Sequence, residues 1–338
     1  MTVVNGKWFD RVIVTFLENT DYAHALAQSP LSELHTTHNG TLLINYHGVT
    51  HPSQPNYVAF ATGDLKVKDD VVRDIEGESL VDLLERKGVS WGSYCEEYPD
   101  NWTGEKPFLD HAHGRYVRRH NPFASLKSVQ DNPTRAKNIK SAEAFKRELE
   151  SNTLPSFIFY TPCQDNNAHD TNITYAARYI KNFYTPLTAH PVFQSHRTLF
   201  VLTFDESASY LFGQNRVATW LLGNAVKSTP LTLQSQLYKS IDWEWAIPSI
   251  KENTINTDKP SIDKPNWYIS NVINLCRVAL PTGDPSEPPK EGNWNDCKFN
   301  HYDILKTIEE NWGLGDLGLN DVSAKGFGEV LRRRDERE

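Results

Sequence analysis

The sequence predicts an α/β fold, in which a doubly wound, mostly parallel sheet carries helices on both faces. Short β-branched apolar runs alternate along the chain with segments of helical periodicity, and this order is typical of such sheets. The chain has 338 residues, 38% of them apolar, which is enough for one large core. Two apolar runs also end directly in acidic residues, where an open α/β sheet binds its ligands.

Each element follows from its local pattern. The predicted strands, all short and apolar, are 11–17, 42–46, 89–95, 156–161, 198–203 and 217–222. The predicted helices are 22–28, 57–61 after a turn at Ser53, 79–87, 142–149, 173–183 and 302–312. The helix at 79–87 has leucines at helical spacing and a glycine, Gly88, at its end.

The alternating pattern breaks down between residues 231 and 297, where prolines and tryptophans accumulate. We interpret the whole chain, 1–338, as a single domain with 231–297 as an inserted, irregular lobe or lid. A disulfide between Cys276 and Cys297 would close this insertion. A second disulfide between Cys95 and Cys163 is the simplest account of those two thiols.

The formal charge of −8, without a strongly basic stripe, argues against a nucleic-acid partner. The sequence holds no run of 18 apolar residues, so no stable membrane insertion is expected. The chain opens without a signal peptide, yet three glycosylation sequons, at Asn39, Asn101 and Asn172, favour an extracellular protein over a cytoplasmic one. The pattern does not predict an oligomeric state.

Oxygen donors follow two of the predicted strands. Glu18 and Asn19 come after the first strand, and Asp205 and Glu206 come after the strand at 198–203. Adjacent acids on a turn usually form only a solvated loop. Because both pairs end buried parallel strands, they are expected to converge, and converging carboxylates either bind a cation or repel one another. A shared metal and a solvated loop are about equally supported by spacing alone.

Ser53 lies between Pro52 and Pro55 at the predicted start of a helix. Serine is a preferred N-cap, which is the simpler interpretation. A hydroxyl at a helix N-terminus is also well placed to attack phosphate, because the backbone N–H groups there favour anions. Asn56, one turn later, has an amide that is able to donate to a phosphoryl oxygen.

Three histidines, His120, His169 and His301, lie in loops or at an element end. A single loop histidine is more often structural than catalytic. Histidine nevertheless titrates near neutral pH, so one of the three is a candidate general acid.

These residues lie in strings that resemble the phosphoesterase family, which contains secreted acid phosphatases and phosphatidylcholine-type phospholipases C and belongs to the alkaline phosphatase superfamily. The strings that carry the resemblance are FLENTDY at 16–22, HPSQPNY at 51–57, TFDES at 203–207, YVRRHNP at 116–122, HDT at 169–171, HY at 301–302 and TIEENWGL at 307–314. The closer likeness is to the shorter acid phosphatases, over about residues 8–225 and 298–325.

The resemblance implies an alkaline-phosphatase-like fold and one divalent metal ion, which is Mg, Ca, Mn or Zn. It implies that the metal ligands are Glu18, Asn19, Ser53, Asp205 and Glu206. Ser53 becomes the nucleophile that is phosphorylated, and Asn56 binds the phosphoryl group. His120 and His169 contact phosphate or protonate the leaving group, with His301 a weaker candidate.

The resulting expectation is hydrolysis of small phosphate monoesters through a phosphoserine intermediate. Two alternatives stay open: a phospholipase C-like phosphodiesterase, and a catalytically inactive ligand-binding protein. A glycosidase that uses Glu18 and Glu206 as its carboxylate pair ranks last, because it leaves Ser53 and Asn56 without a role.

Overall fold

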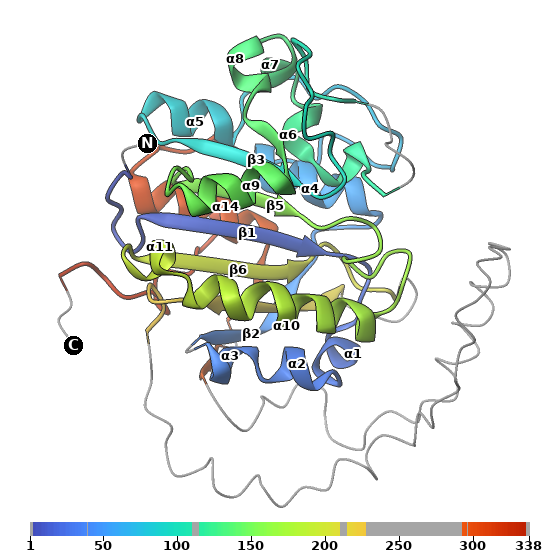
Figure 1. Ribbon diagram of the computed structural model, residues 1–338. Helices are drawn as coiled ribbons and strands as arrows, with labels where there is room; N and C mark the ends of the chain where they lie inside the picture. Colours follow the sequence, from blue (N-terminus) through green and yellow to red (C-terminus); the bar gives the residue numbers. More distant parts are fainter. Residues whose placement is uncertain are drawn as a thin grey trace, which may run out of the picture. The chain divides into compact units, whose positions relative to one another are not determined.

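The computed structural model (Figure 1) describes residues 3–38, 40–109, 115–209, 215–227, 293–295 and 297–335. The predicted insertion at 231–297 lies almost entirely outside these residues, as does Cys276 of the predicted disulfide. The described residues all belong to one compact unit of the chain.

A mixed, mostly parallel sheet of nine strands forms the centre of the described unit. The strands are β1 (Arg11–Leu17), β2 (Thr41–His47), β3 (Trp91–Cys95), β4 (Ile139–Ser141), β5 (Phe157–Thr161), β6 (Thr198–Phe204), β7 (Arg216–Leu222), β8 (Asn293–Asn295) and β9 (Phe299–Asn300). Their spatial order is β4-β3-β5-β1-β6-β7-β2-β8, and β9 also pairs with β2. β7 is antiparallel to both β6 and β2, whereas the other pairs are parallel.

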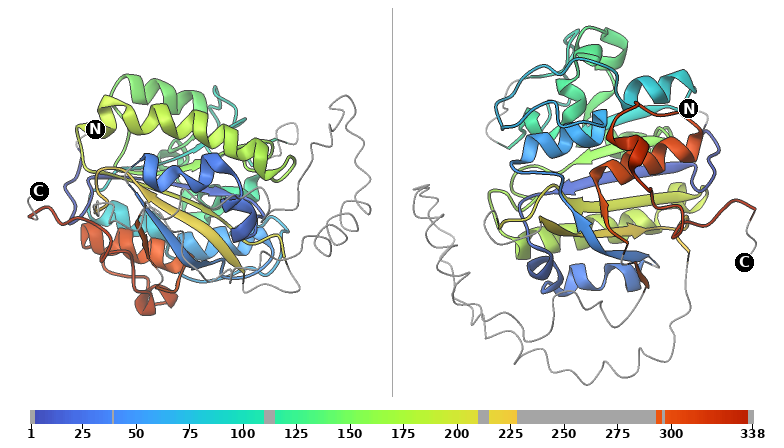
Figure 2. Two further views of the ribbon diagram at one scale, coloured as in Figure 1. Left: turned by 90° about the horizontal axis from the view of Figure 1, so that it is seen from below. Right: turned by 180° about the vertical axis from the view of Figure 1, so that it is seen from behind.

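Helices cover both faces of the sheet, which confirms the predicted α/β fold (Figure 2). The α-helices before β3 are α1 (Tyr22–Leu26), α2 (Ser29–Ser32), α3 (Leu34–Thr37), α4 (Ser53–Thr62) and α5 (Leu80–Arg86). Those after it are α6 (Pro122–Ser125), α7 (Lys127–Gln130), α8 (Pro133–Ala136), α9 (Ala142–Glu150), α10 (Ile173–Ala189), α11 (Pro191–Gln194) and α14 (His301–Trp312). The described residues also contain two 3₁₀ turns, η1 (Arg118–His120) and η4 (Asn320–Ser323). α4 and α14 pack together on one face, and α10 packs with α2 on the other.

β1 is the middle strand of the core. All seven of its residues are buried, because β5 and β6 flank it and helices cover both of its faces. A strand buried on both faces is a continuous apolar run, which is why 11–17 was predictable from sequence. Leu17 of β1 pairs with Phe204 of β6, so the two strands end side by side and their following residues meet at one edge of the sheet (Figure 1).

Two sequence predictions need correction. α10 continues past Phe183 to Ala189, through Pro186, because Tyr184 and Leu187 prolong its buried stripe. The predicted Cys95–Cys163 disulfide is wrong: both residues are buried free thiols, and the Cys95 Sγ accepts a hydrogen bond from Asn121 Nδ2 at 3.2 Å. Buried thiols are a common structural use of cysteine.

Glu309 of α14 is a buried carboxyl beside Asp321 of η4. Neither of its carboxyl oxygens has a hydrogen-bond partner among the described residues. Burial, and then the Asp321 charge, raise the pKa of Glu309 to about 9. The stability that Glu309 contributes is therefore fully present below the ordinary glutamate pKa and is lost as pH rises toward 9.

We therefore expect Glu309→Gln to raise the Tm at pH 8 by several degrees and to flatten the fall in Tm between pH 5 and pH 9. The neutral amide removes the ionisation and is able to donate to the Asp321 carboxylate. Glu310→Gln, at the exposed neighbouring position, is the matched control and should leave the profile unchanged. Identical pH profiles for Glu309→Gln and the wild-type protein would contradict this account.

Candidate active site

The residues that follow β1 and β6 form one buried cluster at the end of the sheet. The backbone N–H of Asp205 donates to the carbonyl of Leu17 at 2.9 Å, and the backbone N–H of Asn19 donates to Asp205 Oδ1 at 3.1 Å. Asn19 reaches this position with a φ of 43°, a left-handed conformation that asparagine tolerates. Glu18, Asp205 and Glu206 are all at most 1% exposed. The two predicted pairs of oxygen donors, Glu18–Asn19 and Asp205–Glu206, therefore lie together.

Ser53 enters this cluster as the first residue of α4, directly after Pro52. Its oxygen lies 3.1 Å from Glu18 Oε2 and 3.4 Å from Glu206 Oε1, so its single O–H is shared between these two acceptors. The serine hydroxyl thus connects the carboxylate after β1 with a carboxylate after β6. Since Pro52 supplies no side-chain cap and Ser53 already lies inside the helix, the N-cap interpretation of Ser53 is wrong.

Burial, and then repulsion between neighbouring carboxylates, disfavour the ionised forms in the cluster. Burial, followed by the nearby Asp205 charge, raises the pKa of Glu18 well above its usual range. Burial, followed by the Glu206 charge, does the same for the pKa of Asp205. Asp205 Oδ2 is buried and has no hydrogen-bond partner in the described part of the chain. Buried carboxylates with an unused oxygen have the chemistry of a site for a hard divalent cation.

The remaining carboxylate oxygens are held by protein donors. The Tyr57 hydroxyl donates to Glu18 Oε1, and His51 Nδ1 contacts Glu206 Oε2. Within the described ranges, no three Asp, Glu, His or Cys side chains form a ready-made metal-binding group. The donor set fits a cation by chemical type and by its orphaned oxygen, and ligation would require some of these hydrogen bonds to exchange.

Asn56 does not have the predicted free amide. Its Oδ1 accepts from the backbone N–H groups of Val49 and Thr50, at 2.8 and 3.0 Å. Its Nδ2 donates to the carbonyls of Thr50 and Pro52, at 2.8 and 3.1 Å. All four hydrogen-bonding positions of the amide are used. Asn56 thus fixes the loop that leads into Ser53, and the phosphoryl-binding role predicted for it requires one of its two donor hydrogen bonds to exchange.

We expect Asn56→Ala to lower kcat about 10- to 100-fold and to lower the Tm by several degrees, since the loop at 49–52 loses four hydrogen bonds and Ser53 its fixed position. Asn132→Ala is the matched control, because it removes only an exposed helix cap and should change Tm without changing kcat. An unchanged Tm with a large rise in KM would instead restore the substrate-binding role.

His120 and His169 lie next to each other at the site, with ring centroids 5.9 Å apart. His120 is buried, its Nε2 lies 3.5 Å from Glu18 Oε1, and its ring stacks on Tyr57. His169 is 30% exposed, and its Nδ1 contacts Asp170 Oδ1 at 2.7 Å. The exposed ring is therefore the better placed of the two to exchange protons with a substrate.

His301 is a structural residue, which corrects its candidate role as a phosphate contact. It is fully buried at the start of α14, and burial lowers its pKa to about 4. Its Nε2 lies 2.6 Å from the Asp205 carbonyl, and its Nδ1 lies 3.0 Å from the Tyr46 hydroxyl. The neutral ring thus fixes the peptide after β6 to α14 and β2.

Three residues at the site were not predicted: Tyr57, His51 and Arg119. Tyr57 follows Ser53 by four residues on α4, a spacing that puts both on one helix face and was readable from sequence. His51 belongs to the same string as Ser53 but carried no separate signal. Arg119 lies in η1, where only the folded turn shows which way each side chain points.

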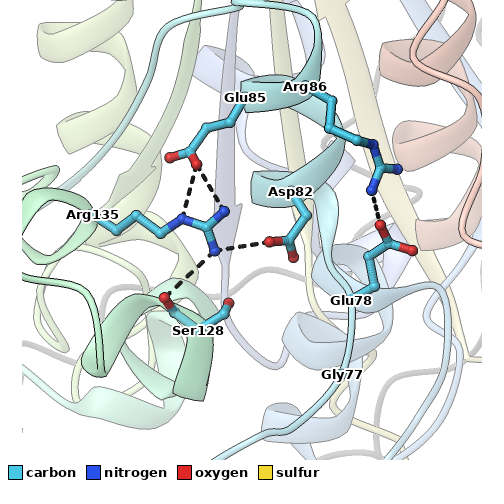
Figure 3. A pocket seen from close by; sticks show the side chains of 7 residues that line it. All are labelled: Gly77, Glu78, Asp82, Glu85, Arg86, Ser128 and Arg135. Carbon is cyan, nitrogen blue, oxygen red and sulfur yellow. Dashed lines mark hydrogen bonds and ion pairs between the residues drawn. The ribbon is translucent and has the colours of Figure 1, made fainter.

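A surface hollow of about 580 Å³ lies away from these residues, lined by residues of α5 and of the segments around it (Figure 3). Arg135 pairs there with Glu85 and Asp82, and Arg86 pairs with Glu78. Its arginines are thus neutralised by their own carboxylates, so the hollow offers no free cation for an anionic ligand.

Comparisons with known proteins identify the family of this chain. A model of the phosphoesterase family matches residues 32–214. A probable acid phosphatase of Kluyveromyces lactis is 32% identical over 338 residues, which cover 91% of this chain and 77% of that protein. The phosphate-repressible acid phosphatase of Penicillium chrysogenum is 37% identical over 257 residues, which cover 73% of this chain and 61% of that protein.

The fold has a relative of known structure in a member of the alkaline phosphatase superfamily from Vibrio parahaemolyticus. The TM-score is 0.50 at 9% identity, over 95% of this chain and 71% of that one. No helix in the described part of the chain is long and apolar enough to cross a membrane. The chain belongs to the phosphoesterase family and is a phosphoric ester hydrolase.

Proposed function

We propose that this protein hydrolyses small phosphate monoesters by double displacement, with Ser53 as the nucleophile. The observation that carries the proposal is the Ser53 hydroxyl, which begins α4 and donates to two buried carboxylates, Glu18 and Glu206. The names of the fungal relatives, which are acid phosphatases, support the choice of a monoester.

In the first step Ser53 Oγ attacks phosphorus, and its proton passes to one of the two carboxylates that accept from it. Of the two, Glu18 Oε2 lies nearer to Ser53 Oγ, at 3.1 Å against 3.4 Å for Glu206 Oε1. The P–O bond to the alcohol breaks, and phosphoserine forms. The N-terminus of α4 stabilises the negative charge of the phosphoryl group.

His169 supplies the proton that the leaving alkoxide takes up. The His169 Nδ1–H donates to the Asp170 carboxylate, and Nε2 faces Arg119 and the site. The proton leaves from Nε2 of the protonated ring, a form in which Nε2 no longer accepts from Arg119. In the second step water attacks the phosphoserine, and the Ser53 oxygen recovers a proton as phosphate leaves. His120, stacked on Tyr57, holds the Glu18 side of the site in place.

Glu18, Asn19, Asp205 and Glu206, together with the Ser53 hydroxyl, would hold a single divalent cation, which we take to be Mg, Ca, Mn or Zn. Such a cation supplies Lewis-acid stabilisation: it lowers the pKa of the serine hydroxyl and neutralises charge on the phosphoryl oxygens. The orphaned Asp205 Oδ2 and the mutual repulsion of the carboxylates support this assignment.

The proposal is tested by comparing 4-nitrophenyl phosphate with bis(4-nitrophenyl) phosphate, and by measuring the metal content of the purified protein. We expect kcat/KM to be at least about 100-fold higher for the monoester, and about one equivalent of a divalent ion per chain. A preference for the diester would favour the phospholipase C-like alternative. No turnover of either ester would favour the inactive ligand-binding protein.

We further propose that the protein acts outside the cell. The sequon residues Asn101 and Asn172 are exposed, as glycan attachment requires, whereas Asn39 lies outside the described residues. Protein recovered from the medium of a secreting host should lose mass on treatment with an N-glycosidase. Unchanged mass together with recovery only from the cell interior would contradict this location.

A further inference from the structure

Arg119 is a cation of the site to which the proposed reaction gives no role. It is the middle residue of η1. A 3₁₀ helix has about three residues per turn, so consecutive side chains point in different directions. Arg118 points away from the site and pairs with Asp74, whereas His120 contacts Glu18. Arg119 points to His169, with a nitrogen 3.4 Å from its Nε2.

A short chain of contacts connects Arg119 with the reacting hydroxyl. His169 is adjacent to His120, the Nε2 of His120 lies 3.5 Å from Glu18 Oε1, and Glu18 Oε2 lies 3.1 Å from Ser53 Oγ. The positive charge of Arg119 also acts on Tyr57, whose hydroxyl donates to Glu18. Arg119 therefore belongs to the same site as Ser53.

The hydrogen-bonding capacity of Arg119 is largely unused. Its Nε is buried and has no hydrogen-bond partner among the residues that the structure describes. It forms no ion pair with a carboxylate there, whereas Arg115 and Arg118 of the same segment each do. A guanidinium has five N–H donors, and leaving buried donors without acceptors is costly. This arrangement suits an anion that arrives from outside the protein.

Carboxylates surround the place where an anionic substrate would bind. Glu18, Asp205 and Glu206 are buried together. With all three ionised, one divalent ion would leave a net negative charge, so a protein cation beside them would favour an anionic substrate. A phosphate monoester carries nearly two charges near neutral pH, and a diester carries only one. Arginine binds two phosphate oxygens at once through its planar fork.

We propose that Arg119 binds the non-bridging oxygens of the phosphoryl group and thereby favours dianionic monoesters over monoanionic diesters. This inference rests on the proposed function for its substrate class. It adds a substrate-binding and specificity-determining residue that lies outside the strand-end cluster.

The test uses the full chain with Arg119→Gln and Arg119→Lys. Arg115→Gln is the matched control, because Arg115 lies four residues away, is exposed, and binds only surface carboxylates. Two readouts are needed: the rise in Tm caused by inorganic phosphate, and kcat/KM for the aryl monoester and the aryl diester.

We expect inorganic phosphate to raise the Tm of the wild-type protein and of Arg115→Gln, and to lose this effect in Arg119→Gln. The kcat/KM for the monoester should fall about 100-fold in Arg119→Gln and that for the diester by less than about 10-fold, with Arg119→Lys between Arg119→Gln and the wild-type protein. Without phosphate, Arg119→Gln should match or exceed the wild-type Tm, because a buried unpaired donor is removed.

A phosphate-induced rise in Tm that persists in Arg119→Gln would overturn the inference, as would equal losses for the two esters. The absence of any phosphate effect on the wild-type protein would also overturn it. If phosphate binding depends on Arg119 while the wild-type protein hydrolyses neither ester, the binding role stands and the proposed function fails.

Discussion

Replacing Ser53 by alanine lowers kcat for 4-nitrophenyl phosphate by about 1,000-fold or more, because the attacking oxygen is lost while the rest of the site remains. Acid-quenched wild-type protein carries a phosphoryl group on the peptide that contains Ser53, and Ser53→Ala carries none. Steady-state kinetics and mass spectrometry of the quenched protein measure the two effects. The loss should be in kcat, since the groups that bind phosphate are unchanged.

Ser151→Ala serves as the control, because Ser151 is exposed at the end of α9 and lies outside the site. The Tm of Ser53→Ala should stay within a few degrees of the wild-type value, since the alanine removes only one hydroxyl from the helix start. Near-normal turnover by Ser53→Ala would disprove the role of Ser53 as nucleophile.

The second large effect is expected on removal of divalent ions. Chelation should abolish turnover and should lower the Tm much more at pH 8 than at pH 5. Without a cation, Glu18 and Asp205 are buried carboxyls whose pKa values are raised well above the usual range. Their contribution to stability is then present below the ordinary carboxyl pKa and is lost as pH rises. Calorimetry with and without chelator, at both pH values, measures this difference.

The variant Asp205→Asn separates the effect of the Asp205 charge on turnover from its effect on stability. The variant should be inactive, and after chelation it should melt above the chelated wild-type protein at pH 8, because one of the repelling charges is absent. Asp131→Asn, an exposed control, should behave like the wild-type protein in both assays. Full activity after chelation, in protein shown to contain no metal, would contradict a metal-dependent reaction.

Much of this site was readable from the sequence because its carboxylates follow two fully buried, mainly apolar strands. β1 and β6 are buried on both faces, so their ends are marked by an abrupt change from apolar to acidic residues. The alternation of strands and helices predicted parallel strands, whose carboxyl ends lie at the same end of the sheet, and so placed Glu18 and Asp205 together. Ser53 was readable because Pro52 and Pro55 flank it at the start of the helix.

The roles of Asn56, His301 and Arg119 were not readable, because each depends on tertiary contacts. The Asn56 amide forms hydrogen bonds with four backbone groups of the preceding loop, and the apolar pattern of the sequence does not predict how that loop folds. His301 is neutral because distant segments bury it beside Tyr46 and Asp205. The pairing of β2 with β7, β8 and β9 also joins segments far apart in the chain, and apolar patterns do not specify which strands become neighbours.

The position of β1 between β5 and β6 limits how far this chain can be shortened without losing its fold and its activity. The family model begins at residue 32 and ends at residue 214, and so omits β1, Glu18 and the helix that bears His301. A fragment trimmed to those limits would lack the central partner of its own sheet. A fragment of this protein therefore has to keep both β1 and α14, because Glu18 follows the strand and His301 of the helix holds the peptide of Asp205.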